Sequence, residues 1–160
     1  MPTIRVSLNS KSIDEAIKQV EAYKKKVEKL AENAVHTAVE MGVETAKDLA
    51  MYMNAYDSGE LVNGIVAEYD DPTHGRIVST APHSAFVEMG TGIVGKQNPG
   101  SSIPGWQYDV NEHGEEGWWY VGKDGKRHWT KGMPSRPYMY ETAKILKDSI
   151  PWIVEGELKK

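Results

Sequence analysis

Apolar residues recur every three or four positions from residue 13 to residue 53. This spacing places them on one face of an α-helix, so we predict one long amphipathic helix over residues 12–54 that starts at a capping box of Ser12 and Glu15. Such a helix measures roughly 60 Å, more than a compact domain of this size. It therefore either breaks near Gly42 or overhangs the body. We favour a helix, straight or bent, that lies across a sheet and overhangs it, and an overhanging amphipathic helix needs a partner.

Alternation of apolar and polar residues predicts several short strands. TIRVSL at residues 3–8 has this pattern, and a turn at residues 57–59 separates the long helix from a strand containing Ile65, Ala67 and Tyr69. DDPTHG is then expected to be a hairpin loop, and RIVSTA its returning strand. HSAFVEMG is predicted to be a third strand or a helical turn.

The C-terminal half contains further short strands and one helix. IPGWQYDV, GWWYVG and RHWTKG are separated by glycine-containing turns and are predicted to be strands. A last helix is expected to take Pro137 as its first residue and to kink or end at Pro151. Its predicted apolar face consists of Tyr138, Thr142, Ile145 and Leu146. The order of elements indicates an α+β fold with a mainly antiparallel sheet, in one domain over residues 1–160.

The composition narrows the classes of function. Cysteine is absent, which excludes disulfides and thiolate metal sites. Lys and Arg number 19 against 23 Asp and Glu, and the sequence pI is about 5.7, so the balance argues against a dedicated nucleic-acid binder. No apolar run approaches the ~20 residues that cross a bilayer, and the N-terminus resembles no signal peptide. We therefore expect synthesis in the cytosol, no membrane partner and no sequence-specific nucleic-acid partner.

The glycines of VEMGTGIVGKQNPG have the G-x-G-x-x-G spacing of phosphate-binding loops, at Gly90, Gly92 and Gly95, followed by Lys96. A phosphate loop needs a helix immediately downstream, whose amides face the anion. Here Pro99 and further prolines and glycines follow, and no βαβ unit surrounds the segment. We interpret Gly90 and Gly92 as the site of a sharp turn, and residues 93–105 as a non-helical loop.

No catalytic or metal-binding pattern stands out among the polar residues. The histidines at 74, 83, 113 and 128 form no H-x-x-x-H or H-E-x-x-H pair. Asp57, Ser58 and Glu60 flank Gly59 and are typical of turn chemistry. We therefore predict no enzymatic activity, no metal and no cofactor.

Residues 93–131 contain an insert with a crowded set of tryptophans, Trp106, Trp118, Trp119 and Trp129. GWWYVGKDGKRHWTKG looks like one copy of an aromatic cell-wall binding repeat, whose rings hold choline or glucan. Such repeats work in tandem arrays, and one copy is present here. The simpler interpretation is a β-hairpin around KDGK, with packing among Trp118, Tyr120 and Trp129.

Three further segments together resemble a known family. AYDSGELVNGI at residues 55–65 is similar to a P-V-D-T-G-x-L-R-x-S-I motif, and STAPHSAFVEMGTG at 79–92 to A-P-Y-A-x-x-V-E-x-G-T-G. KGMPSRPYMYETAKIL at 131–146 resembles G-x-P-A-R-P-F-L-x-x-A. Their order and spacing are those of the gene-product-ten-like tail components of long-tailed bacteriophages, and the resemblance covers residues 35–150. The motif positions, which we take as candidate interface residues, are Asp57, Gly59, Leu61, Val87, Glu88, Gly90, Thr91, Gly92, Pro134, Arg136, Pro137 and Tyr138.

The resemblance implies a structural virion protein that completes the tail or joins it to the head. It implies self-assembly into a ring, hexameric by analogy, whose partners are the tail tube or tail terminator protein and the head connector proteins. The location implied is the virion, in the tail or the head–tail neck, after synthesis in the bacterial cytoplasm. Glu88 and Arg136 lie inside the motifs, and we hypothesise that they pair within or between subunits.

Overall fold

The structure is a computed structural model that describes residues 7, 9–55, 59–100, 105–108, 112 and 115–160. Its elements follow in chain order as α1 (Ser10–Tyr52), α2 (Glu60–Asn63), β1 (Ile65–Asp71), β2 (His74–Ser79), α3 (Ser84–Met89), α4 (Gly92–Gln97), β3 (Trp118–Val121), β4 (Arg127–Thr130) and α5 (Tyr138–Leu158). The α+β prediction is confirmed. The strand predicted over residues 3–8 lies outside the described residues, apart from Ser7.

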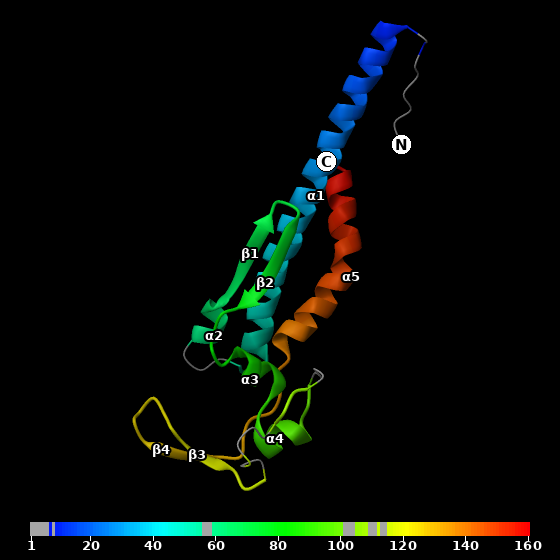
Figure 1. Cartoon of the computed structure of the whole chain (residues 1–160). Coiled ribbons are helices and arrows are strands. Elements are labelled where there is room, and N and C mark those ends of the chain that lie inside the picture. Colours follow the sequence, from blue (N-terminus) through cyan, green and yellow to red (C-terminus); the bar gives the residue numbers. More distant parts are fainter. Residues whose placement is uncertain (1–6, 8, 56–58, 101–104, 109–111, 113–114) are drawn as a thin grey trace.

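The long helix is confirmed as one continuous α1, and it overhangs the body (Figure 1). Its start differs from the prediction, because the side chain of Asn9 accepts the backbone N–H of Ser12 at 2.8 Å and is the N-cap. Ser12 instead lies inside the helix, and its Oγ accepts the N–H of Ser7. Asparagine is as strong a cap as serine, so the earlier start is favourable.

Gly42 does not break α1 but lets two neighbours approach it closely. A Cβ at this position would lie 2.2 Å from Ile77 Cδ1 and 2.6 Å from Leu146 Cδ1. The helix therefore packs on strand β2 and helix α5 at the same level, which a larger residue would prevent. The cost of a helical glycine, about 1 kcal/mol, is offset by this packing.

The strands form two separate antiparallel hairpins rather than one sheet. In the first, Ile65 pairs with Ser79 and Tyr69 with Gly75, which confirms the predicted DDPTHG turn. In the second, β3 pairs with β4 around KDGK. The described part of the predicted strand IPGWQYDV, residues 105–108, has no strand conformation.

The core lies where α1, the first hairpin and α5 meet, and α5 runs beside the C-terminal half of α1 (Figure 1). Its central buried cluster consists of Val43, Ala46, Ala50, Ala55, Leu61, Ile65, Ala81, Val87 and Tyr138. In the described chain, no helix has both the length and the apolar character that crossing a membrane requires.

Helix α5 departs from its prediction in three details. Pro137 is its N-cap rather than its first residue, and Ile145 is exposed although Tyr138 and Thr142 are buried. The helix also continues through Pro151 to Leu158. Burial of Ser149 and Ile153 on either side holds this segment against the body, and that packing outweighs the ~3 kcal/mol penalty of proline in a helix.

Candidate functional site

The second and third sequence motifs meet as paired backbones below the body. The N–H of Thr91 donates to the carbonyl of Met133 at 2.9 Å, and the N–H of Met133 donates back to Thr91 at 3.2 Å. Further along, the N–H of Arg136 donates to the carbonyl of Val87 at 2.9 Å. Residues 131–136 therefore run antiparallel to residues 87–94, and we call this arrangement the backbone clasp.

Glycines make the backbone clasp possible. A Cβ on Gly132 would lie 1.9 Å from the carbonyl oxygen of Thr91, and one on Gly92 would lie 2.4 Å from that of Lys131. One on Gly90 would lie 2.7 Å from the backbone nitrogen of Ser135. All three also have positive φ, which glycine adopts without strain. The predicted sharp turn at Gly90 and Gly92 is confirmed, and the close backbone approach explains the glycine spacing.

The prediction that residues 93–105 form a non-helical loop is wrong for its first part, because residues 92–97 form α4. Pro99 stands beyond the end of this helix and so does not prevent it. The amides that would cradle a phosphate are already used internally. Gly92 donates to Tyr108, Val94 to Lys131 and Gly95 to Thr91. The geometry therefore disfavours a phosphate site here.

Glu88 joins α3 to the start of α5. Its carboxylate accepts the backbone N–H of Met139 at 3.0 Å and that of Tyr140 at 2.9 Å, which are otherwise unpaired amides of the first helical turn. Partial burial raises the pKa of the Glu88 carboxyl, although the two amide hydrogen bonds act in the opposite direction. Ser135 Oγ also donates to the Glu88 carbonyl. Glu88 is therefore a helix cap supplied by a distant segment.

The hypothesised pairing of Glu88 with Arg136 does not occur within the subunit. In the part of the chain that the structure describes, no ion pair joins the two residues, and the Arg136 guanidinium instead lies 4.0 Å from Met133 Sδ. The Glu88 oxygens are occupied by the α5 amides, which explains the difference. A pair between subunits stays a prediction.

The remaining motif residues build the fold. Gly59 has φ +80° and is the N-cap of α2, and Leu61, Val87 and Tyr138 share the core cluster. The Tyr138 hydroxyl donates to Ser79 Oγ at 2.9 Å, which ties the third motif to β2. Pro134 is half-buried in the clasp, and Asp57 lies outside the described residues. The three motifs therefore converge on one core.

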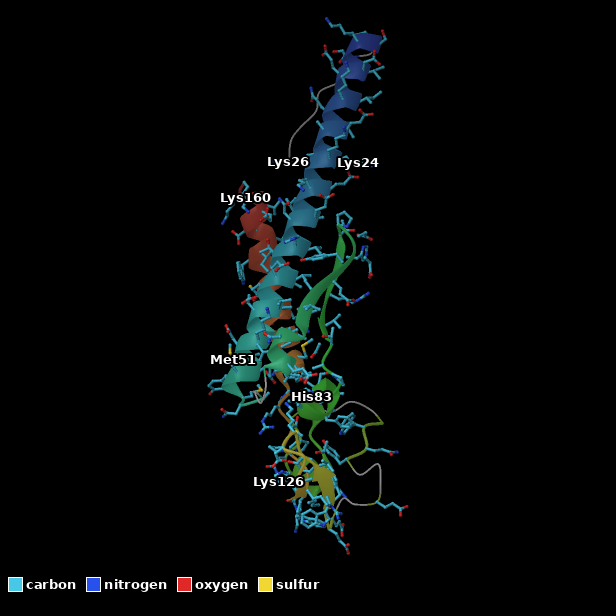
Figure 2. The ribbon with its side chains drawn as sticks, turned by 90° about the vertical axis from the view of Figure 1, so that its left-hand side faces the viewer. Lys24, Lys26, Met51, His83, Lys126 and Lys160 are labelled. Atoms are coloured by element: carbon cyan, nitrogen blue, oxygen red, sulfur yellow. The ribbon has the colours of Figure 1, made fainter. Side chains whose placement is uncertain are left out.

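An apolar stripe is left exposed on the overhanging half of α1. Its side chains are 43 to 55 % exposed, and they are Ile13, Ile17, Val20, Tyr23 and Val27. At 100° per residue they continue the face that is buried further along the helix, where burial begins at Ala34. The stripe starts beyond the end of α5, where Asn33 Nδ2 donates to Glu157 (Figure 2). We call it the α1 stripe.

The tryptophan-rich hairpin exposes a second apolar surface. Trp119 pairs with Trp129 across the strands, with ring centroids 5.4 Å apart at 67°, and the Arg127 guanidinium lies over the Trp119 ring. The predicted packing of Trp118 with Trp129 is wrong, because the register places Trp118 on the opposite face. There its ring lies against Gly92, where it anchors the hairpin to α4.

Trp106, the fourth tryptophan of the insert, belongs to neither β3 nor β4 and packs edge to face on Phe86. Its ring therefore does not extend the surface formed by Trp119 and Trp129. The alternative sugar-binding use of all four tryptophans would need four rings with faces open to one ligand, whereas Trp106 packs on Phe86 and Trp118 lies against Gly92.

Several exposed titratable groups of the body form pairs at the surface. His74 Nδ1 lies 2.8 Å from an oxygen of Asp71, and hydrogen bonds from His74 and Thr73 lower the pKa of Asp71 to about 2. Among the described residues, no three His, Asp or Glu side chains come together as a metal site.

These features define an α+β protein whose three sequence motifs build its core and whose exposed apolar side chains include the α1 stripe and one face of the β3–β4 hairpin. Residues 14–90 match the family described as Bacteriophage HK97-gp10, putative tail-component. Over this range, from α1 to the end of α3, the chain matches that phage tail-component family, and the resemblance inferred from the motifs is confirmed there. The third motif and the tryptophan hairpin lie beyond the match. No curated protein and no solved structure matches the chain.

Proposed function

We propose that this tail component is a structural subunit of a homo-oligomeric ring that completes the tail at the head–tail interface. The ring would contact the tail tube or tail terminator protein on one side and the head connector proteins on the other. Six copies are the number that the family resemblance implies. The role is mechanical rather than enzymatic, and its place is the neck of the virion.

The α1 stripe is the observation that carries this proposal. Five large side chains at helical spacing are exposed to water, and each fully buried one would contribute about 1.5–3 kcal/mol. Exposed contiguous apolar surface of this kind marks protein–protein contact. The family match to a tail component suggests that the α1 stripe is covered by other virion proteins, including further copies of this chain.

Acidic residues line one side of the α1 stripe at regular intervals. Asp14, Glu21 and Glu28 recur every seven residues along one side of it, and Lys24 interrupts its centre. In an antiparallel helix pair these acidic rows would face each other and repel. The pattern therefore favours helices that run parallel, as subunits of a ring with one common axis must.

Light scattering coupled to size exclusion, at several concentrations, tests the proposal. The wild-type chain is expected to form a defined oligomer, and Ile17→Glu, which places a charge in the stripe, is expected to shift the mass to the monomer. Ala22→Glu adds the same charge on the opposite side of α1 and is the matched control, with unchanged mass. A wild-type chain that stays monomeric even with its neck partners present, or equal masses for the two variants, contradicts the proposal.

A further inference from the structure

We propose that the β3–β4 hairpin of one copy docks on the C-terminal end of α1 in the neighbouring copy. This inference rests on the ring proposed above and specifies the contact that closes it. It uses a second pair of surfaces, distinct from the α1 stripe.

The hairpin presents an aromatic and basic face. Trp119 and Trp129 are 55 % and 48 % exposed, and Val121 is 69 % exposed on the same face as Arg127. Residues 118–131 contain four Lys or Arg and one Asp, in a chain whose net charge is −4. Tryptophan and arginine are the residues that most often dominate the energy of protein interfaces.

The hairpin also has the shape of an arm. Figure 1 shows β3 and β4 transverse to the axis of α1 and projecting past the side of the body. A two-stranded hairpin is marginally stable alone in water, and Trp118 attaches only one face of this one to α4. Cover from another chain would stabilise the exposed face.

The C-terminal end of α1 offers the complementary surface. Glu44, Asp48, Met51 and Tyr52 lie on successive turns of one side of the helix, and all are exposed. Tyr52 is 83 % exposed. Asp48 forms no ion pair within the described ranges, so its charge is available to a partner. We call these four residues the acidic patch.

The two surfaces match in chemistry. The patch offers two carboxylates beside two apolar side chains, and the hairpin offers aromatic rings beside Arg127 and Lys126. Both lie on the side of the body away from the α1 overhang, and Lys126 lies beyond Met51 along the long axis of the molecule (Figure 2). Because a surface of one copy meets a different surface of the next, the contact is head-to-tail, the kind that closes rings.

Disulfide trapping between two variants tests the contact, since the chain has no cysteine of its own. Full-length Val121→Cys is mixed with full-length Tyr52→Cys and oxidised. We expect at least tenfold more cross-linked heterodimer than from Val121→Cys mixed with Ile150→Cys, which places the thiol at another exposed position, on α5. Equal yields from the two mixtures would overturn the proposal.

A charge exchange gives an independent readout. Arg127→Glu is expected to weaken self-association at least tenfold, and Asp48→Lys in the same chain is expected to restore it in moderate salt. Loss without restoration contradicts the contact. An oligomer that is disrupted by Ile17→Glu but gives no selective cross-link would refute this inference while the ring stands. Absence of any oligomer refutes both.

Discussion

The carboxylate of Glu88 accepts the backbone N–H of Met139 at 3.0 Å, so the helix that precedes the glycine turn holds the start of the last helix in place. The backbone clasp binds the same two segments a few residues away, through Thr91 and Met133. These contacts join parts of the chain that lie some 40 to 50 residues apart in sequence, on either side of the tryptophan insert. The body and the α1 overhang are thereby fixed relative to the base of the hairpin.

Replacing Glu88 with alanine is expected to destabilise the fold by about 1–3 kcal/mol, because two amides of the first turn of α5 lose their acceptor. Urea unfolding followed by circular dichroism measures this loss. Glu155→Ala is the control, since that carboxylate is exposed on α5 and pairs with Lys159 at the surface. Its removal is expected to cost less than about 0.5 kcal/mol. A similar loss of unfolding free energy for both substitutions would show that the Glu88 cap contributes no more to stability than an exposed surface ion pair.

The stability difference between the wild type and Glu88→Gln is expected to depend on pH. Burial raises the folded-state pKa of Glu88 above its ordinary value of 4.5, so the folded chain binds this proton more tightly than the unfolded chain does. The stabilisation is present in full below the ordinary value and is lost as pH rises through the raised pKa. The unfolding free energy of the wild type should therefore rise relative to that of the glutamine variant as pH falls from 7 to 4.

Unfolding free energies of the two proteins at several pH values test this sign. The lowered pKa of Asp71 makes both proteins less stable as pH falls below its ordinary value of 3.8 toward about 2, and this effect cancels in the difference. If the unfolding free energy of the wild type instead rose relative to that of the variant as pH rose, the amide hydrogen bonds rather than burial would control the ionisation of Glu88.

Local patterns predicted the local elements well. The periodicity of α1 and the alternation in β1 and β2 depend on neighbours in sequence, and all three elements were predicted within a few residues of their bounds. The length of α1 left a break near Gly42 or an overhang as alternatives, and the structure has the overhang that we favoured. Short motifs indicated the family, and with it the class of tail component, because they include residues such as Val87 and Gly90 that the fold requires.

Contacts between distant segments were not predictable in the same way. The capping role of Glu88 depends on the amides of Met139 and Tyr140, and no local sequence pattern predicts a helix cap that comes from another element. The glycine spacing has the form of a phosphate loop, and only the position of residues 131–135 shows that it serves a close backbone contact. Trp118 and Trp119 are adjacent tryptophans that the sequence alone does not distinguish, and the strand register determines which of them is exposed.

Choline and cell-wall glycans are expected to leave the tryptophan fluorescence of the protein unchanged. Sugar and choline sites use ring faces that are open to the ligand, whereas Trp119 and Trp129 meet at 67° and Arg127 covers one face of Trp119. Titration of the full chain to millimolar ligand, with Trp119→Ala and Trp129→Ala for comparison, measures the response. A saturable change that both substitutions abolish would favour a wall-binding module over the ring contact proposed for this hairpin.

Gly132→Ala is expected to cost more than about 3 kcal/mol or to prevent folding, because a Cβ there would lie 1.9 Å from the carbonyl oxygen of Thr91. Gly125→Ala is the matched control, since Gly125 also has positive φ but has open space where a Cβ would stand, with no contact within 4 Å. The control should therefore cost only the backbone strain of about 1–2 kcal/mol. Thermal and urea unfolding give both values.

Gly92→Ala gives a second measurement of the same backbone contact, which is needed because Gly132→Ala can abolish folding altogether. A Cβ on Gly92 would lie 2.4 Å from the carbonyl oxygen of Lys131, so this substitution too is expected to cost more than the Gly125 control. Equal losses of unfolding free energy at the clasp positions and at Gly125 would contradict this prediction. They would mean that glycine is needed there only for its positive φ and not for the close approach of the two backbones.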